Sequence, residues 1–177
     1  MSKNQRAFSI FELLVGMSIT ATLLLITLTS LHNFIAKNNT LRQVNKIVAV
    51  MQLAKMEAIR RGEPITFCKS SDQKKCGGNW CDGQIVIAKD GTIIRNLEAL
   101  PPGDKLTWKS SFSKNDALVF LPSGATNGQQ GSFFYCTVNA PNENLAIIIE
   151  NDGRIRISNK TATGKNIICD YNPKVID

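Results

Sequence analysis

The chain has 177 residues and a mass of 19.5 kDa, enough for one domain with a substantial core and an accessory segment. Apolar residues make up 43% and charged residues 20%, which excludes a wholly disordered chain. The net charge of +7 is uneven, with +2 in residues 1–7, +3 in 8–63, −1 in 64–152 and +3 in 153–177. With one histidine and no cluster of paired acids or ligand-type side chains, we expect no catalytic residues, no metal and no cofactor.

The N-terminal segment is unlike that of an ordinary soluble protein. Residues 1–7 are short, polar and basic, and residues 8–31 follow as a run in which 15 of 24 residues are apolar. A helix of that length reaches about 36 Å, which is enough to cross a bilayer. Lys3 and Arg6 predict that the leading end stays cytoplasmic. A secretory signal peptide is the alternative, but the run is too long and no small-x-small cleavage site follows.

Glu12 is the anomaly of this run, because a carboxylate among apolar residues is costly unless it is paired. The alternative is that Glu12 lies near the membrane interface and its carboxylate simply reaches the polar region. The segment Ala7–Val15, AFSIFELLV, resembles the processing site of type IV pilins and type II secretion pseudopilins. The resemblance implies that prepilin peptidase cleaves between Ala7 and Phe8 and methylates the new amine. It also implies that Glu12 neutralises the N-terminal amine of a neighbouring subunit during assembly. The family usually has glycine where this chain has Ala7.

A second helical pattern continues this run. Apolar residues recur at three- and four-residue steps at Leu41, Val44, Ile47, Val48, Met51, Ala54 and Ala58. Arg60, Arg61, Gly62 and Pro64 are typical of a helix end. We predict one helix from about residue 8 to residue 61, with residues 8–31 in the membrane and residues 32–63 as an amphipathic part against a sheet.

From residue 64 onward, short apolar stretches alternate with turn sequences, which is typical of strands. The predicted strands are Ile65–Cys68, Gln84–Ala88, Thr92–Leu97, Leu106–Lys109, Leu118–Leu121, Ser132–Val138, Leu145–Glu150, Arg154–Ser158 and Asn166–Cys169. A long helix followed by antiparallel strands predicts an α+β fold, and the resemblance implies the type IV pilin fold. Residues 64–177 would form a periplasmic β-rich domain.

Five cysteines, at positions 68, 76, 81, 136 and 169, all follow the helix and fall on the periplasmic side, where disulfides persist. Zinc bound by Cys68, Cys76 and Cys81 is the alternative, although the chain has no C-x₂-C pair. The segment Ile65–Asp72, with Cys76, Trp80 and Gly83, resembles the FimT/GspH-type minor pilins. The resemblance implies the disulfides Cys68–Cys76 and Cys136–Cys169 and leaves Cys81 over. An exchange of Cys76 and Cys81 stays open.

The most basic stretch follows a predicted turn at residues 151–153. Arg154 and Arg156 fall on one face of a strand, and Lys160 and Lys165 follow on a loop. Between Gly153 and Cys169 there are four positive charges and no acid, so we interpret the stretch as unopposed. Guanidinium groups on alternate residues suit phosphate binding.

Gly153-Arg154-x-Arg156 resembles the GRxR motif of FimT-like minor pilins, which bind DNA during natural transformation. The resemblance implies that Arg154 and Arg156 are ligands of double-stranded DNA, that Gly153 shapes the turn, and that Lys160 and Lys165 add charge. The alternative is that the arginines only solubilise an exposed strand.

We therefore predict a FimT-like minor pilin and not an enzyme. It would be held in the inner membrane by a single pass, enter the type IV pilus at the cell surface, and capture extracellular DNA. Its partners would be double-stranded DNA, other pilin subunits, prepilin peptidase and the inner membrane. The alternative is a structural minor pilin or type II secretion pseudopilin that primes filament assembly without binding DNA.

Overall fold

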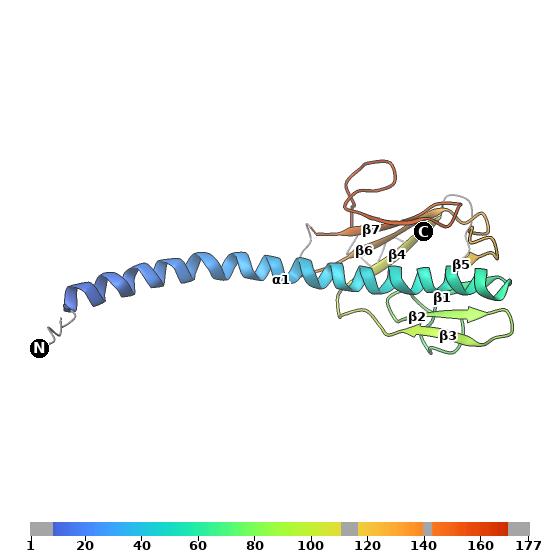
Figure 1. Cartoon of the computed structure of the whole chain (residues 1–177), viewed down its shortest axis with the longest axis horizontal. Coiled ribbons are helices and arrows are strands. Elements are labelled where there is room, and N and C mark those ends of the chain that lie inside the picture. Colours follow the sequence, from blue (N-terminus) through green and yellow to red (C-terminus); the bar gives the residue numbers. More distant parts are fainter. Residues whose placement is uncertain (1–8, 111–116, 140–142, 170–177) are drawn as a thin grey trace, which may run out of the picture. The chain divides into compact units, whose positions relative to one another are not determined.

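The computed structural model describes residues 9–110, 117–139 and 143–169, without the side chains of residues 25–30, 32 and 33. Helix α1 (Ile10–Arg61) comes first, and the strands follow it (Figure 1). The chain divides into two compact units, Met1–Asn38 and Asn39–Asp177.

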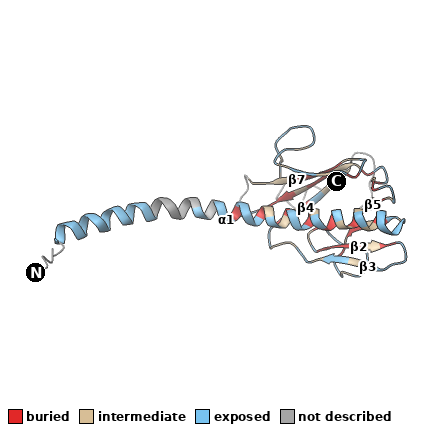
Figure 2. Cartoon of the chain, in the orientation of Figure 1, coloured by how far each residue is buried: buried red, intermediate tan, exposed pale blue. Residues whose placement is uncertain are grey.

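The first unit contains the N-terminal part of α1, and its surface is largely apolar. Every side chain described between residues 9 and 35 is exposed, as the pale blue helix in Figure 2 shows. The large apolar ones include Ile10, Phe11, Leu13, Leu14, Leu23, Leu24 and Phe34. An exposed apolar surface of this extent is typical of a surface that another molecule or phase covers. Within the described residues, no helix combines the length and the apolarity needed to cross a membrane.

In the second unit, α1 buries the predicted apolar stripe. The fully buried residues of this part of the helix are Val44, Ile47, Met51, Ala54 and Ala58, while Leu41 and Val48 are half-buried. Because these residues recur at three- and four-residue steps, they share one face, and that face forms the helical side of the core.

The helix ends at the predicted signals. Gly62 takes a φ of +68°, and its amide donates to the carbonyl of Ala58 at 3.0 Å, which satisfies one of the last helical carbonyls. Arg60 and Arg61 both pair with Glu57 in the last turn. The hydrogen bonds from Arg60 and then Arg61 lower the pKa of Glu57 to about 2.

Two antiparallel sheets complete the second unit. The first has the order β3 (Ile93–Leu97), β2 (Gln84–Ala88), β1 (Ile65–Lys69), β5 (Ala117–Phe120). The second has the order β4 (Lys105–Ser110), β6 (Gly131–Cys136), β7 (Leu145–Ile149), β8 (Ile155–Ser158). In Figure 1, β2 and β3 appear on one side of α1 and β6 and β7 on the other.

Both sheets contribute to one core with the helix. Phe67 of the first sheet and Phe133 of the second meet edge to face, with ring centroids 6.0 Å apart. Trp80 packs against both rings, and Trp108 packs against Phe133. Tyr135 is fully buried in the same cluster and donates its hydroxyl to Asp104. These aromatic residues are therefore core residues.

The α+β prediction is confirmed, with a long helix packed on antiparallel sheets. Eight of the nine predicted strands are present within two residues of their predicted ends, but the strand predicted at Asn166–Cys169 is wrong. The only pairing described there is an isolated bridge between Lys160 and Asn166, and Ile168 is 89% exposed. Ile167 and Ile168 suggested a strand, but this segment follows a turn at Thr161–Lys165 and does not pair along a sheet edge.

Candidate functional site

The predicted basic turn is a tight hairpin between β7 and β8. The amide of Gly153 donates to the carbonyl of Glu150 at 2.9 Å, and the amide of Glu150 donates to the carbonyl of Arg154 at 3.0 Å. Gly153 has a φ of +74°, in the left-handed region that favours glycine. Asp152 accepts the amide of Arg154 at 2.9 Å through its side chain, which holds the chain where it enters β8.

The hairpin turn is anchored to two other parts of the second unit. The ammonium of Lys55, on α1, donates to the carbonyl of Gly153 at 3.0 Å. The amide of Thr126 donates to the carbonyl of Asn151 at 2.9 Å. At Gly153 the fit is so close that a β-carbon would lie 1.9 Å from the carbonyl oxygen of Gly124. The arginines that follow therefore start from a fixed piece of backbone.

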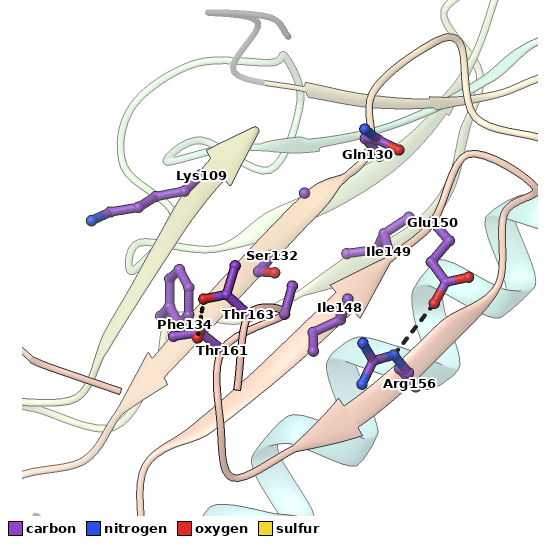
Figure 3. Close-up of a pocket in the computed structure, with 12 residues that line it drawn as sticks. Lys109, Gln130, Ser132, Phe134, Ile148, Ile149, Glu150, Arg156, Thr161 and Thr163 are labelled. Atoms are coloured by element: carbon purple, nitrogen blue, oxygen red, sulfur yellow. Dashed lines mark hydrogen bonds and ion pairs between the residues drawn. The ribbon is translucent and has the colours of Figure 1, made fainter. Parts of the chain in front are cut away.

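Arg154 and Arg156 reach the same outer face of the second sheet, and both contact Glu150. Their side chains are 67% and 47% exposed. Arg154 Nη2 lies 2.5 Å from Glu150 Oε2, and Arg156 Nε lies 3.4 Å from Glu150 Oε1. Figure 3 shows the contact between Arg156 and Glu150 as a dashed line. The hydrogen bond from Arg154 lowers the pKa of Glu150, and Glu150 in turn raises the pKa of Arg154.

This carboxylate corrects the interpretation of the basic stretch as unopposed. Glu150 lies only four residues before Arg154 in the sequence, and the hairpin brings it across to the arginines. Asp152 also acts on Arg154 through its charge. The arginines thus already share an intramolecular anion, which any external phosphate has to displace.

The two lysines are in a different situation. Lys160 and Lys165 are exposed, and neither ammonium has an ion pair or hydrogen bond with any residue that the structure describes. Their loop is held by two hydrogen bonds between Thr161 and Lys165: the amide of Thr161 donates to the carbonyl of Lys165 at 2.9 Å, and the amide of Lys165 donates to the hydroxyl of Thr161 at 3.0 Å.

A disulfide fixes the far end of this loop. Cys169 is bonded to Cys136, whose strand lies in the middle of the second sheet, so the chain after β8 returns across the sheet. Cys68 is bonded to Cys76, and Cys81 is free and half-buried. The pairing equals the one that the resemblance implies. Because Cys68 and Cys76 are in a disulfide, they are not thiolate ligands, and the described residues hold no group of three His, Cys, Asp or Glu side chains placed for a metal.

The structure thus brings Gly153, Arg154 and Arg156 together at one corner of the second sheet, with Lys160 and Lys165 on the adjoining loop. Glu12 belongs to the first unit, where its side chain is exposed. Ala7 and Phe8, the predicted processing site, lie outside the described residues.

Sequence reasoning missed two features of this site. Glu150 was discoverable, because a turn at residues 151–153 places residue 150 opposite residue 154. The second feature could not be found from the sequence: a pocket of about 440 Å³ lies beside Arg156, on the outer face of the second sheet (Figure 3). Its walls come from Lys109, Ser132, Phe134 and Ile148, which strand pairing alone brings together.

The fold and the N-terminal sequence are those of a pilin-like subunit. The prokaryotic N-terminal methylation motif matches residues 2–28, and the family described as type II transport protein GspH matches residues 43–153. The second match covers more than half of the chain, and the protein belongs to the GspH family. No match is found among the curated proteins.

Crystal structures of one type IV minor pilin have the same fold. The type IV minor pilin FimU of Pseudomonas aeruginosa, in one crystal form, has a TM-score of 0.56 and 19% identity, over 71% of this chain and 92% of FimU. A second crystal form gives a TM-score of 0.51 and 18% identity, over 64% and 88%. The minor pseudopilin EpsH of the Vibrio cholerae type 2 secretion system has a TM-score of 0.48 and 15% identity, over 66% and 93%.

Proposed function

We propose that this protein is a minor type IV pilin that binds double-stranded DNA without sequence specificity, for uptake in natural transformation. Arg154 and Arg156 are the primary phosphate ligands, and Lys160 and Lys165 add charge. The observation that carries this proposal is the anchored hairpin: two exposed guanidinium groups project from one sheet face beside two lysines that have no described partner.

The assembly part of the proposal rests on the first unit. Prepilin peptidase cleaves between Ala7 and Phe8, residues 8–31 hold the subunit in the inner membrane, and Glu12 pairs with the N-terminal amine of a neighbouring subunit. The methylation motif over residues 2–28 and the exposed apolar surface of α1 support this. An apolar helix of this kind is stable only when lipid or other subunits cover it.

The expected affinity for DNA is modest. Phosphate contacts carry no base information, so binding should be independent of sequence and should weaken steeply with salt. Glu150 holds both arginines in the free protein, and the energy of breaking those contacts lowers the net gain from a phosphate. About two to four neutralised phosphates predict a slope of log affinity against log salt between roughly −2 and −4.

Fluorescence anisotropy with labelled duplex DNA tests the proposal on the full chain in non-ionic detergent. Arg154→Gln and Arg156→Gln should each weaken binding strongly and change the unfolding transition only slightly, because both side chains are exposed and an exposed ion pair adds little stability. Arg95→Gln is the matched control, since Arg95 is exposed on β3 of the other sheet. Absence of binding by the wild-type protein at low salt, or equal effects of all three substitutions, would contradict the proposal.

Two observations favour a second function, that of a type II secretion pseudopilin or purely structural minor pilin. The family is named after a type II transport protein, and Glu150 forms an ion pair with both arginines without any ligand. In that case the arginines stabilise the hairpin and keep the strand soluble. Substituting them would then alter stability or filament assembly and leave DNA capture untouched.

A further inference from the structure

The pocket beside Arg156 lies on a single row of residues that crosses the second sheet. Lys109 on β4 pairs with Ser132 on β6, Ser132 pairs with Ile148 on β7, and Ile148 pairs with Arg156 on β8. Neighbouring strands are about 4.8 Å apart, so about 14 Å separates the α-carbons at the two ends of the row. A cationic side chain therefore stands at each end of a short floor formed by Ser132 and Ile148.

The walls of the pocket combine an aromatic ring with hydroxyl groups. Phe134 follows Ser132 by two residues on β6 and shares its face, and the ammonium of Lys109 lies 6.0 Å from the centre of the ring. Thr161 and Thr163 stand over this side of the floor, on the loop that the Cys136–Cys169 bond ties back to the sheet (Figure 3).

Two side chains of the pocket have unused capacity for hydrogen bonds. Ser132 is only 6% exposed, lines the pocket, and its hydroxyl has no hydrogen-bond partner among the described residues. Arg156 contacts Glu150 through Nε, and its two terminal nitrogens have no partner in the described part of the chain. A buried hydroxyl and a half-exposed guanidinium without full partners are suited to a polar ligand that completes them.

These features fit one ligand chemistry. An aromatic ring and an isoleucine offer an apolar face to a planar base, hydroxyls offer donors and acceptors to its edges, and cations at both ends suit flanking phosphates. The volume of about 440 Å³ lies within the usual range of small-ligand pockets, about 300–1,000 Å³. The bases of a blunt duplex are already paired and stacked, so only an unpaired base is available to the floor of the pocket.

We propose that this pocket holds one unpaired nucleotide of single-stranded DNA, with its base against Phe134 and Ile148 and its neighbouring phosphates on Lys109 and Arg156. The inference rests on the proposed DNA binding and names the form of DNA that the site prefers. DNA with a single-stranded end should bind more tightly than blunt duplex with the same number of phosphates, because only the former adds a stacked base to the phosphate contacts.

The test compares three labelled DNAs on the full chain in non-ionic detergent: a blunt duplex, the same duplex with a short thymidine overhang, and a longer blunt duplex with the same phosphate count as the second. The overhang should tighten binding about fivefold or more relative to the longer blunt duplex, because stacking of one base is worth that factor. Ala162→Leu should reduce this preference, since Ala162 is exposed and lines the pocket, and the larger aliphatic side chain fills space there without adding a charge or an aromatic ring.

Ala162→Ser is the matched control and should keep the preference. Lys109→Gln should reduce it without affecting the fold, because its side chain is on the exposed surface. Equal binding of the overhang and of the longer blunt duplex, or a preference that is unchanged in Ala162→Leu, would overturn the pocket proposal while leaving duplex binding by the arginines intact. If none of the three DNAs binds, the proposed function fails and this inference fails with it.

Discussion

The arginine hairpin and the lysine loop carry the same charge but are held in different ways. The hairpin, residues 150–156, is tied to α1 through Lys55 and to the segment at Gly124 and Thr126, and its cations are paired with Glu150. The loop, residues 159–169, is held by its own turn and by the Cys136–Cys169 bond, and its lysines have no described ion pair.

The two regions differ in how firmly their cationic side chains are positioned and in whether a carboxylate of the same chain opposes them. The hairpin holds the guanidinium groups of Arg154 and Arg156 in fixed positions, but Glu150 competes with phosphate for them. The loop supplies point charges that have no competitor but less fixed positions. The arginines should therefore determine where a phosphate binds. The energy needed to separate them from Glu150 should limit how tightly it binds.

The largest expected effect is on the loop, from removing its disulfide. The Cys136–Cys169 bond closes a sequence separation of 33, so replacing both cysteines by alanine should lower the free energy of unfolding by about 3–4 kcal/mol on the chain-entropy estimate. The Cys68–Cys76 bond spans a separation of 8, and its removal should cost about 2–3 kcal/mol. Denaturant unfolding reads both values, and only the first replacement should weaken DNA binding. A weaker effect from the first pair than from the second would contradict this assignment.

The next effect compares one glycine from each region. Gly153→Ala should cost about 2–4 kcal/mol, because its φ is +74° and the new β-carbon would lie 1.9 Å from the carbonyl oxygen of Gly124. Gly164→Ala has a similar φ of +80° but open space around it, so only about 1 kcal/mol is expected. Unfolding transitions of the two variants measure the difference. Equal destabilisation would mean that the hairpin is not wedged against Gly124.

The internal competitor can be removed directly. Glu150→Gln keeps the size of the side chain but releases Arg154 and Arg156 from a carboxylate, so duplex DNA should bind several-fold more tightly. Glu98→Gln is the control for loss of one negative charge, since Glu98 is exposed after β3 in the other sheet. Anisotropy titrations at one fixed salt concentration compare them. Unchanged or weaker binding by Glu150→Gln would show that the carboxylate does not compete with phosphate.

The same competition predicts a smaller, pH-dependent effect. The pKa of Glu150 is lowered by the hydrogen bond from Arg154, so the ion pair stabilises the protein above the ordinary glutamate pKa and is lost as the pH falls through the lowered value. Bound phosphate takes the arginines away and returns the pKa of Glu150 toward its usual range. The complex therefore takes up a proton, and DNA affinity should rise as the pH falls below about 5. Glu150→Gln should lack the part of the rise in DNA affinity that comes from protonation of Glu150. Identical pH profiles of the variant and the wild-type protein would exclude this contribution.

The helix and eight strands followed from the sequence because their signals are local. The three- and four-residue spacing from Val44 to Ala58 defines a helix face, and Gly62 and Pro64 mark its end. Asn166–Cys169 failed because two neighbouring isoleucines indicate a strand only when a partner edge is available. Here a turn at Thr161–Lys165 and the bond to Cys136 direct the chain across the sheet instead.

The candidate site was only partly predictable for a related reason. The shared face of Arg154 and Arg156 follows from strand periodicity, whereas their neutralisation by Glu150 needs the register of the turn. The row from Lys109 to Arg156 joins residues 47 positions apart in the numbering through three strand pairings, and no local pattern encodes it.

The most direct test of the central claim is natural transformation by cells that carry Arg154→Gln together with Arg156→Gln in the chromosomal copy. The comparison strain carries Lys160→Gln with Lys165→Gln, which removes the same amount of charge from the loop. We predict that the arginine strain still assembles pili but loses transformation, while the lysine strain keeps part of it, because the anchored guanidinium groups organise the phosphate contacts. Normal transformation by the arginine strain with normal piliation would contradict the account and favour a purely structural subunit.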